Sequence, residues 1–264
     1  MKAPLYIGLI LTGIMFCFVS PGFDIDISAS SEKWQILVNG NTLSGWQAQD
    51  PSKPHEWTTA KTVKVNPHNN RLFEIKSGQG MFVNGKTGKT QNLVSSKHFS
   101  DIEAHIEFNV PHKSNSGVFF MGLYELQVQD DYGRKDLVFS MCGGFYARKI
   151  GGYYSSSNEW VGGTPPKVNA CKPPGVWQTF DVKFKAPRFN SEGKKIKNAL
   201  FLEVRQNGIL IHQNVEMPGP NSAHMPIPEA PTGPLMLQGD HGPVAYRNVR
   251  IRSNLPSTRA RPIL

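Results

Sequence analysis

Cysteine is scarce in this sequence, and its spacing excludes the usual structural zinc sites. The 264 residues contain only three cysteines, at positions 17, 142 and 171. None lies close enough in sequence to another cysteine or a histidine to form a structural zinc motif. A glycine-rich phosphate loop and the nucleophile elbow of serine hydrolases are also absent. We therefore expect neither a zinc-stabilised fold nor nucleotide or serine-hydrolase chemistry.

Positive charge is in excess but is not concentrated anywhere. Lysine and arginine number 29 against 20 acidic residues, which gives a formal net charge of +9. The basic residues are scattered, without a run or a recognition motif, so no nucleic-acid partner is predicted. We expect a soluble basic protein, with weak attraction to an anionic envelope surface as the alternative.

Only one long apolar run occurs, and it lies at the N-terminus. Leu5–Val19 follows Lys2 and is shorter than the roughly 20 residues of a membrane-spanning helix. We interpret 1–30 as a signal peptide, which predicts an exported protein, periplasmic or extracellular. No clean cleavage site follows, so a retained membrane anchor is the alternative. The remaining chain is predicted to form one domain over 31–253 and a basic tail over 254–264.

Two cysteines remain once the leader is removed. An even pair in an exported chain predicts one disulfide, between Cys142 and Cys171. Such a bond would stabilise the domain by about 2–4 kcal/mol. The alternative is a pair of buried free thiols.

Apolar residues recur with a period of two in the rest of the chain. Residues 101–109, 178–185 and 199–206 alternate apolar and polar side chains, as half-buried strands do. Asn207-Gly208 follows the last of them, and both turn positions of such a hairpin need a positive φ. About a dozen such segments separated by turns, without an amphipathic helix, predict an all-β protein of two antiparallel sheets packed face to face.

Two long irregular segments, 151–175 and 216–233, interrupt the predicted strands. Loops of this length are uncommon in compact domains and are often functional. The first carries aromatic side chains that could stack on a sugar ring, namely Tyr153, Tyr154 and Trp160. Trp46, in contrast, is expected in the core.

The segment 124–130 has the pattern most suggestive of a binding site. Its apolar side chains share one face, and the opposite face carries Glu125, Gln127 and Gln129. A row of carboxylate and amide groups can donate to and accept from sugar hydroxyls. The alternative is an ordinary polar outer face of an antiparallel sheet.

A second candidate group is Asp240-His241, which lies between Gly239 and Gly242. These side chains could form an acid–base pair, and the alternative is a solvated turn in which the aspartate caps the backbone. If the chain used two glycosidase carboxylates, they would lie about 5–10 Å apart. The candidates for such a pair are Glu107, Glu125, Asp130 and Asp240.

The ordered set of motifs resembles the bacterial 3-keto-disaccharide hydrolase family, also described as a 3-keto-glucoside 1,2-lyase/3-keto-2-hydroxyglucal hydratase domain. The resemblance spans residues 34–252. It is carried by LVNGNTLSGW at 37–46, NSG at 115–117, YELQV at 124–128, NACKPPG at 169–175, WQTFD at 177–181, NG at 207–208, and GPL, LQ, DHG and YRNV between 233 and 249.

This resemblance implies a concanavalin-A-like jelly roll that binds glycosides already oxidised to a ketone at C3. The ketone acidifies the C2 proton, so a base can start elimination of the C1 substituent, and water then adds to the resulting glucal. The family pattern indicates only which positions belong to the site, and the chemistry of each residue suggests its role. Glu125 is the expected base or acid, with Asp240 and His241 as further acid–base candidates. The expected substrate-binding residues are Asn115, Gln127, Asp130, Lys172, Gln238 and Arg247.

The sequence departs from the family pattern at Met121, where many relatives carry an arginine that could stabilise enolate charge. That role would pass to Lys172 or Arg247. No cofactor is predicted; a divalent cation could stabilise the enolate, but no ligand spacing requires one. The expected partner is an oligosaccharide or glycoside, and a membrane only through an uncleaved leader. The rival hypotheses are a non-catalytic glycan-binding module and a structural envelope protein.

Overall fold

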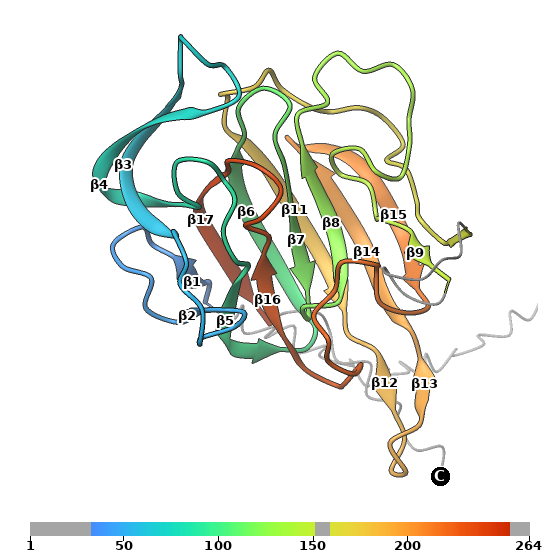
Figure 1. Cartoon of the computed structure of the whole chain (residues 1–264). Coiled ribbons are helices and arrows are strands. Elements are labelled where there is room, and N and C mark those ends of the chain that lie inside the picture. The colour runs from blue at the N-terminus through green and yellow to red at the C-terminus, as the bar shows by residue number, and fades with distance from the viewer. Residues whose placement is uncertain (1–32, 151–158, 254–264) are drawn as a thin grey trace, which may run out of the picture. The chain divides into compact units, whose positions relative to one another are not determined.

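The computed structural model describes residues 33–150 and 159–253 (Figure 1). The predicted leader, the C-terminal tail and two of the candidate sugar-stacking residues, Tyr153 and Tyr154, lie outside the described residues. Every strand pairing is antiparallel, and the described residues contain no helix. Accordingly, no helix in this part of the chain is long and apolar enough to cross a membrane.

The strands form two main sheets. The larger sheet has eight strands, in the order β15 (Ile209–Met217), β14 (Ala199–Gln206), β11 (Gln178–Lys185), β6 (Ile102–Asn109), β17 (Ala245–Arg252), β4 (Phe73–Val83) and β3 (Thr58–Val65), with β1 (Gln35–Val38) also paired to β17. The smaller sheet has five, in the order β2 (Trp46–Ala48), β5 (Leu93–Phe99), β16 (Gly233–Leu237), β7 (Asn115–Phe120) and β8 (Tyr124–Gln129).

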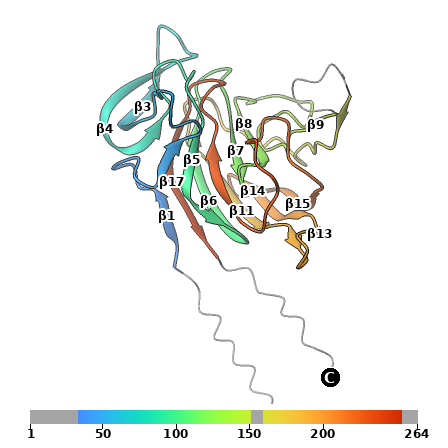
Figure 2. The ribbon, with the colours of Figure 1, turned by 60° about the horizontal axis from the view of Figure 1, so that its bottom comes forward.

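Two short ribbons complete the fold, β9 (Arg148–Lys149) with β10 (Trp160–Val161) and β12 (Arg188–Phe189) with β13 (Lys195–Lys197). In both views β3 and β4 lie on one side of the sandwich and β9 on the other (Figure 2). The predicted all-β, two-sheet antiparallel sandwich is confirmed. The periodic segments 178–185 and 199–206 coincide with β11 and β14.

The core lies between the two sheets and is rich in phenylalanine. Phe120 of β7 contacts Phe184 and Phe201 of the larger sheet at ring-centroid distances of 5.3 and 5.1 Å. Tyr124 of β8 reaches Phe184 at 5.9 Å. Trp46 is buried against the same core, as expected. Because apolar side chains alternate along β8, burying Tyr124, Leu126 and Val128 directs the intervening residues to the outer face of the smaller sheet.

The two cysteines correct one prediction. Cys142 and Cys171 are free thiols in this structure, so the predicted disulfide is not formed. Both sulfur atoms lie near the Gln206 side-chain amide, at 3.5 and 3.4 Å from Nε2. Burial raises the pKa of the Cys142 thiol, and its hydrogen bond to Cys171 lowers the pKa of Cys171. The prediction of a bond relied on an even cysteine count and expected export, and neither determines the oxidation state of two adjacent thiols.

Candidate functional site

The outer face of the smaller sheet carries a polar recess that collects five of the predicted site residues. It has a volume of about 80 Å³ and is lined by Asn115, Glu125, Gln127, Tyr146, Ser222, Ala223, Gln238 and His241. Asn115 begins β7, Glu125 and Gln127 belong to β8, and Gln238 follows β16. These strands are neighbours in the sheet, which explains why residues far apart in sequence meet here.

A wider hollow of about 470 Å³ adjoins the recess. The two cavities share four lining residues, which are Ser222, Ala223, Gln238 and His241. The hollow adds Gln49, Asn92, His224 and Asp240. The recess and the hollow together therefore form one polar site, with His241 at the boundary between them.

Glu125 is the most perturbed carboxyl group of this site. Its residue is only 3% exposed, and its carboxyl oxygens have no hydrogen bond within the described residues. Burial, followed by the negative charge of Asp240, raises the pKa of Glu125 to about 8. A carboxyl group with a pKa near the working pH can both take and return a proton, which suits general acid–base catalysis.

Glycine at position 117 makes room for this carboxyl group. Gly117 lies on β7, diagonally across from Glu125, whose direct cross-strand neighbour is Phe119. A Cβ atom at position 117 would lie 2.5 Å from Glu125 Oε1, which is too close for non-bonded atoms. The NSG triplet thus serves the site through the missing side chain of its glycine, a role that its sequence did not reveal.

Three amides line the recess and have unsatisfied oxygens. The side-chain oxygens of Asn115, Gln127 and Gln238 are buried and have no hydrogen-bond partner within the described residues. Unpaired buried acceptors destabilise a fold, so their concentration in one place indicates a functional constraint. The same described residues contain no cluster of three or more His, Cys, Asp or Glu placed to hold a metal ion.

Asp240 and His241 form the second acid–base element. His241 Nδ1 lies 2.5 Å from Asp240 Oδ1, and both side chains are partly exposed. Burial opposes ionisation of Asp240, but the hydrogen bond and charge of His241 outweigh it and hold the pKa of Asp240 below its usual value. Asp240 is therefore the ionised partner that orients the imidazole ring.

The turn that carries this pair is anchored by a fully buried asparagine, Asn84. Its Nδ2 donates to the carbonyls of Gly239 and Gly242, at 3.0 and 2.8 Å, and its Oδ1 accepts from Val244 N–H at 2.8 Å. Sequence reasoning missed Asn84. An asparagine directly after the buried end of a strand was the available signal.

Replacing Asn84 with alanine is expected to destabilise the fold by about 2–4 kcal/mol, because it leaves buried backbone groups unpaired. Turnover should fall as well, since the Asp240–His241 turn loses its anchor. Thermal denaturation and steady-state kinetics measure the two effects. Asn198→Ala is the matched control, because the Asn198 amide donates to an exposed carboxylate, Glu216, at 3.1 Å. Equal stability of the two variants would contradict the assigned role.

Three predicted substrate-binding residues lie away from both cavities. Asp130 accepts hydrogen bonds from His112 and from Lys113 N–H, at 2.9 and 3.0 Å, and so holds the turn before β7. Lys172 is exposed and donates to a backbone carbonyl at 3.4 Å. Arg247 pairs with Glu107 at 2.6 Å on the larger sheet. Asp130, Lys172 and Arg247 thus have structural partners of their own.

Position 121 lies in the turn between β7 and β8. Met121 has a positive φ of 59° and is buried in the core between the sheets. Neither Lys172 nor Arg247 lines the recess or the hollow. Among the described residues, no other lysine or arginine lines them either, so none takes the place of the arginine that many relatives carry at position 121.

Tyr146 is an aromatic lining residue that the sequence did not single out. Residues 143–145 pair with the edge strand β8, through the Gln127 backbone at 2.9 and 2.8 Å, and so bring Tyr146 to the recess. Trp160, a predicted sugar-stacking residue, contacts the Tyr146 ring edge-on at 5.8 Å. It does not line the recess itself.

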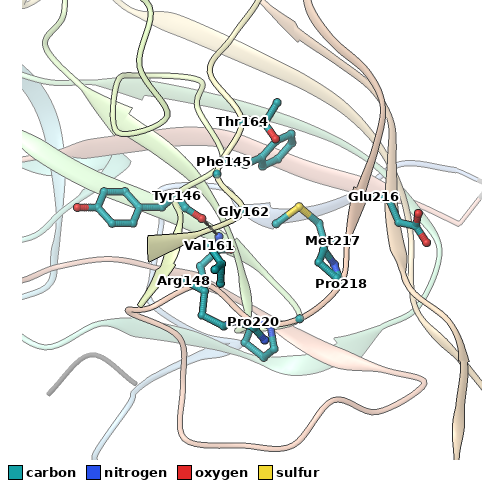
Figure 3. Close-up of a pocket in the computed structure, with 13 residues that line it drawn as sticks. Phe145, Tyr146, Arg148, Val161, Gly162, Thr164, Glu216, Met217, Pro218 and Pro220 are labelled. Atoms are coloured by element: carbon teal, nitrogen blue, oxygen red, sulfur yellow. Dashed lines mark hydrogen bonds between the residues drawn. The ribbon is translucent and has the colours of Figure 1, made fainter. Parts of the chain in front are cut away.

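Tyr146 also borders a separate cavity of about 120 Å³ (Figure 3). Its ring points away from that cavity, which Phe145, Arg148, Met217, Pro218 and Pro220 surround. None of the predicted catalytic residues lines it. The recess beside Glu125 is therefore the candidate active site.

Comparisons with known proteins agree with this architecture. A solved structure from Parabacteroides distasonis ATCC 8503, described as a candidate glycosyl hydrolase, is similar at 26% identity and a TM-score of 0.57, covering 83% of each chain. Another from the same organism and with the same description has 17% identity and a TM-score of 0.50, over 84% of this chain and 99% of its own, and shares the fold. The expected jelly-roll sandwich is confirmed.

The family comparison covers almost the whole described chain. A search of curated proteins found no match. Residues 33–252 match the sequence profile of the 3-keto-alpha-glucoside-1,2-lyase-like domain. The chain therefore belongs to this carbohydrate-acting family.

Proposed function

We propose that this chain cleaves glycosides that carry a ketone at C3, with Glu125 as the general base. The observation that carries the proposal is a buried carboxyl group of raised pKa in a recess lined by amides. A ketone makes the neighbouring C2 proton acidic, and a carboxylate whose pKa lies near 8 is a better base than an ordinary one. The family assignment supports a carbohydrate substrate.

The reaction begins when the Glu125 carboxylate removes the C2 proton. The electron pair of the C2–H bond then forms an enolate with the C3 oxygen. As the ketone re-forms, the C1–O bond breaks and the leaving oxygen takes a proton, which gives an unsaturated ketone with a C1–C2 double bond. Water adds to C1 and a proton returns to C2, so the net reaction is hydrolysis.

His241 is the proposed donor of the proton to the leaving oxygen. It borders both the recess and the hollow, which is where the bond between the two halves of a glycoside would lie. Asp240 orients the imidazole ring through their 2.5 Å contact. The amides of Asn115, Gln127 and Gln238 bind the hydroxyls and the enolate oxygen by hydrogen bonds. The wider hollow accepts the departing sugar.

The test is incubation of the purified protein with 3-keto-disaccharides of α and β linkage, with release of the unmodified sugar as the readout. Release is expected from at least one of them. The same disaccharides without the ketone are the control and should remain intact, because their C2 proton is not acidic. Sugar binding without turnover across the panel would reject the enzyme in favour of a glycan-binding module.

Met121 is the observation that favours this second candidate. With an apolar residue at this position, and no lysine or arginine among the described residues that line the recess, stabilisation of the enolate there comes from neutral amides and His241. A binding module needs no such stabilisation and could use the same recess. Isothermal titration with oxidised and unoxidised disaccharides separates the candidates, because the enzyme should prefer the oxidised form and a module need not.

A further inference from the structure

The segment 221–225 crosses the outer face of the smaller sheet beside Glu125. It belongs to the long irregular stretch between β15 and β16. Ser222 and Ala223 from this segment line both the recess and the hollow. Ala223 also packs against a small apolar cluster on that face, made by Val94, Phe119 and Met236. The segment thus forms a wall of the site.

Building on the proposed function, we propose that Asn221 is a positioning residue for Glu125, because it fastens this segment across the recess and thereby keeps the carboxyl group buried. Asn221 is itself buried, at 2% exposure. Its Oδ1 accepts from the backbone N–H of Glu125, and its Nδ2 donates to the backbone carbonyl of Tyr146. Its own N–H donates to Leu123 O at 3.0 Å.

One side chain therefore connects three parts of the site. These are the strand that carries Glu125, the stretch that carries Tyr146, and the wall formed by 221–225. Tyr146 and Asn221 both line the cavity of Figure 3, and Tyr146 also borders the recess, so the Asn221 contact holds a stretch of backbone that the two cavities share.

Further hydrogen bonds continue the attachment along the segment. Lys149 N–H donates to Ser222 Oγ at 2.8 Å, and Ser222 Oγ donates to Ala147 O at 3.2 Å. Met225 N–H donates to Gly122 O at 2.9 Å. The segment is bonded on both sides, and Asn221 supplies the bonds nearest to Glu125.

Loss of this fastening would admit water to Glu125. Burial is the largest cause of its raised pKa, so a loosened wall lowers that pKa. The other ionisable groups of the site are Asp240 and His241 after β16, His224 of the segment itself, Tyr246 of β17 and Tyr146. Asn221 bonds Tyr146 through the backbone carbonyl and not through the phenol, so these ionisable side chains remain when Asn221 is replaced.

The test measures the Glu125 pKa directly, by NMR titration of carboxyl-labelled protein, and so does not depend on turnover. In Asn221→Ala the pKa is expected to fall by about one unit or more toward its ordinary value. The value of kcat/KM on a 3-keto substrate should fall by about 10–100-fold. The rise of kcat/KM with pH should move to lower pH, because the pKa of the base is lower. Asn198→Ala is the control and should change neither.

A folded Asn221→Ala protein with an unchanged Glu125 pKa would overturn the proposal. If that variant does not fold, Asn221→Ser provides the test, because a short hydroxyl side chain cannot bridge Glu125 and Tyr146 together. The same fall in pKa is expected, and an unchanged value would again reject the role of Asn221. A shifted pKa in a protein that turns over no 3-keto-glycoside would reject the proposed reaction and leave the positioning role intact.

Discussion

Replacing Glu125 with glutamine is expected to lower kcat/KM on a 3-keto-glycoside by about 10²–10⁴-fold, the usual contribution of a general base. The amide keeps the shape of the side chain but cannot accept the C2 proton. In the unmodified protein, kcat/KM should rise with pH through about 8, because the reactive form of Glu125 is the carboxylate. A pH profile without this rise would contradict Glu125 as the base.

The same substitution has a second expected effect, on stability. The folded pKa of about 8 exceeds the ordinary value of 4.5, so folding favours the protonated form. This contribution is complete below the ordinary pKa and is lost as pH rises through the folded pKa. Glu125→Gln should therefore match the unmodified protein at about pH 4 and exceed its stability by a few kcal/mol at about pH 9.

Denaturant unfolding at the two pH values measures this difference. Glu107→Gln is the matched control, because Glu107 is ion-paired with Arg247 on the other sheet. Burial opposes ionisation of Glu107, but hydrogen bonds from Asn248 and Arg247 outweigh it and lower the pKa. The control should keep its activity and should not gain stability at alkaline pH. A stability difference for Glu125→Gln that does not depend on pH would contradict the raised pKa.

Replacing Gly117 with alanine is expected to lower kcat/KM by about 10²-fold while the protein stays folded. The added Cβ would lie 2.5 Å from Glu125 Oε1, so the carboxyl group must move. The backbone of Gly117 does not have a positive φ, and alanine can therefore adopt it without strain. The loss is expected in the chemical step, because a displaced base no longer reaches the C2 proton.

Kinetics, thermal denaturation and a crystal structure of the variant together test this expectation. The structure should show the Glu125 side chain in a different rotamer. An unmoved carboxyl group with unchanged kcat/KM would show that the site does not depend on glycine at this position. A displaced carboxyl group with full activity would instead remove Glu125 from the mechanism.

The sequence alone determined the strands and the direction in which their side chains point. β11 and β14 coincide with the predicted segments because one face of each is buried, so that apolar residues must recur every second position. The Asn207-Gly208 hairpin followed from the need for positive φ, and the observed values are 53° and 82°. The same alternation assigned Glu125 and Gln127 to one face of β8.

Only the tertiary structure decided which polar residues meet. Gln238 lines the same recess as Glu125 because β16 is inserted between β5 and β7, an order that no local pattern encodes. Asn84 and Asn221 act through backbone groups far along the chain, and Asp130 and Arg247 are engaged elsewhere. Alternation is a local property that reports the face of a strand. Distances across a sheet depend on strand order and packing, which are set by the whole chain at once.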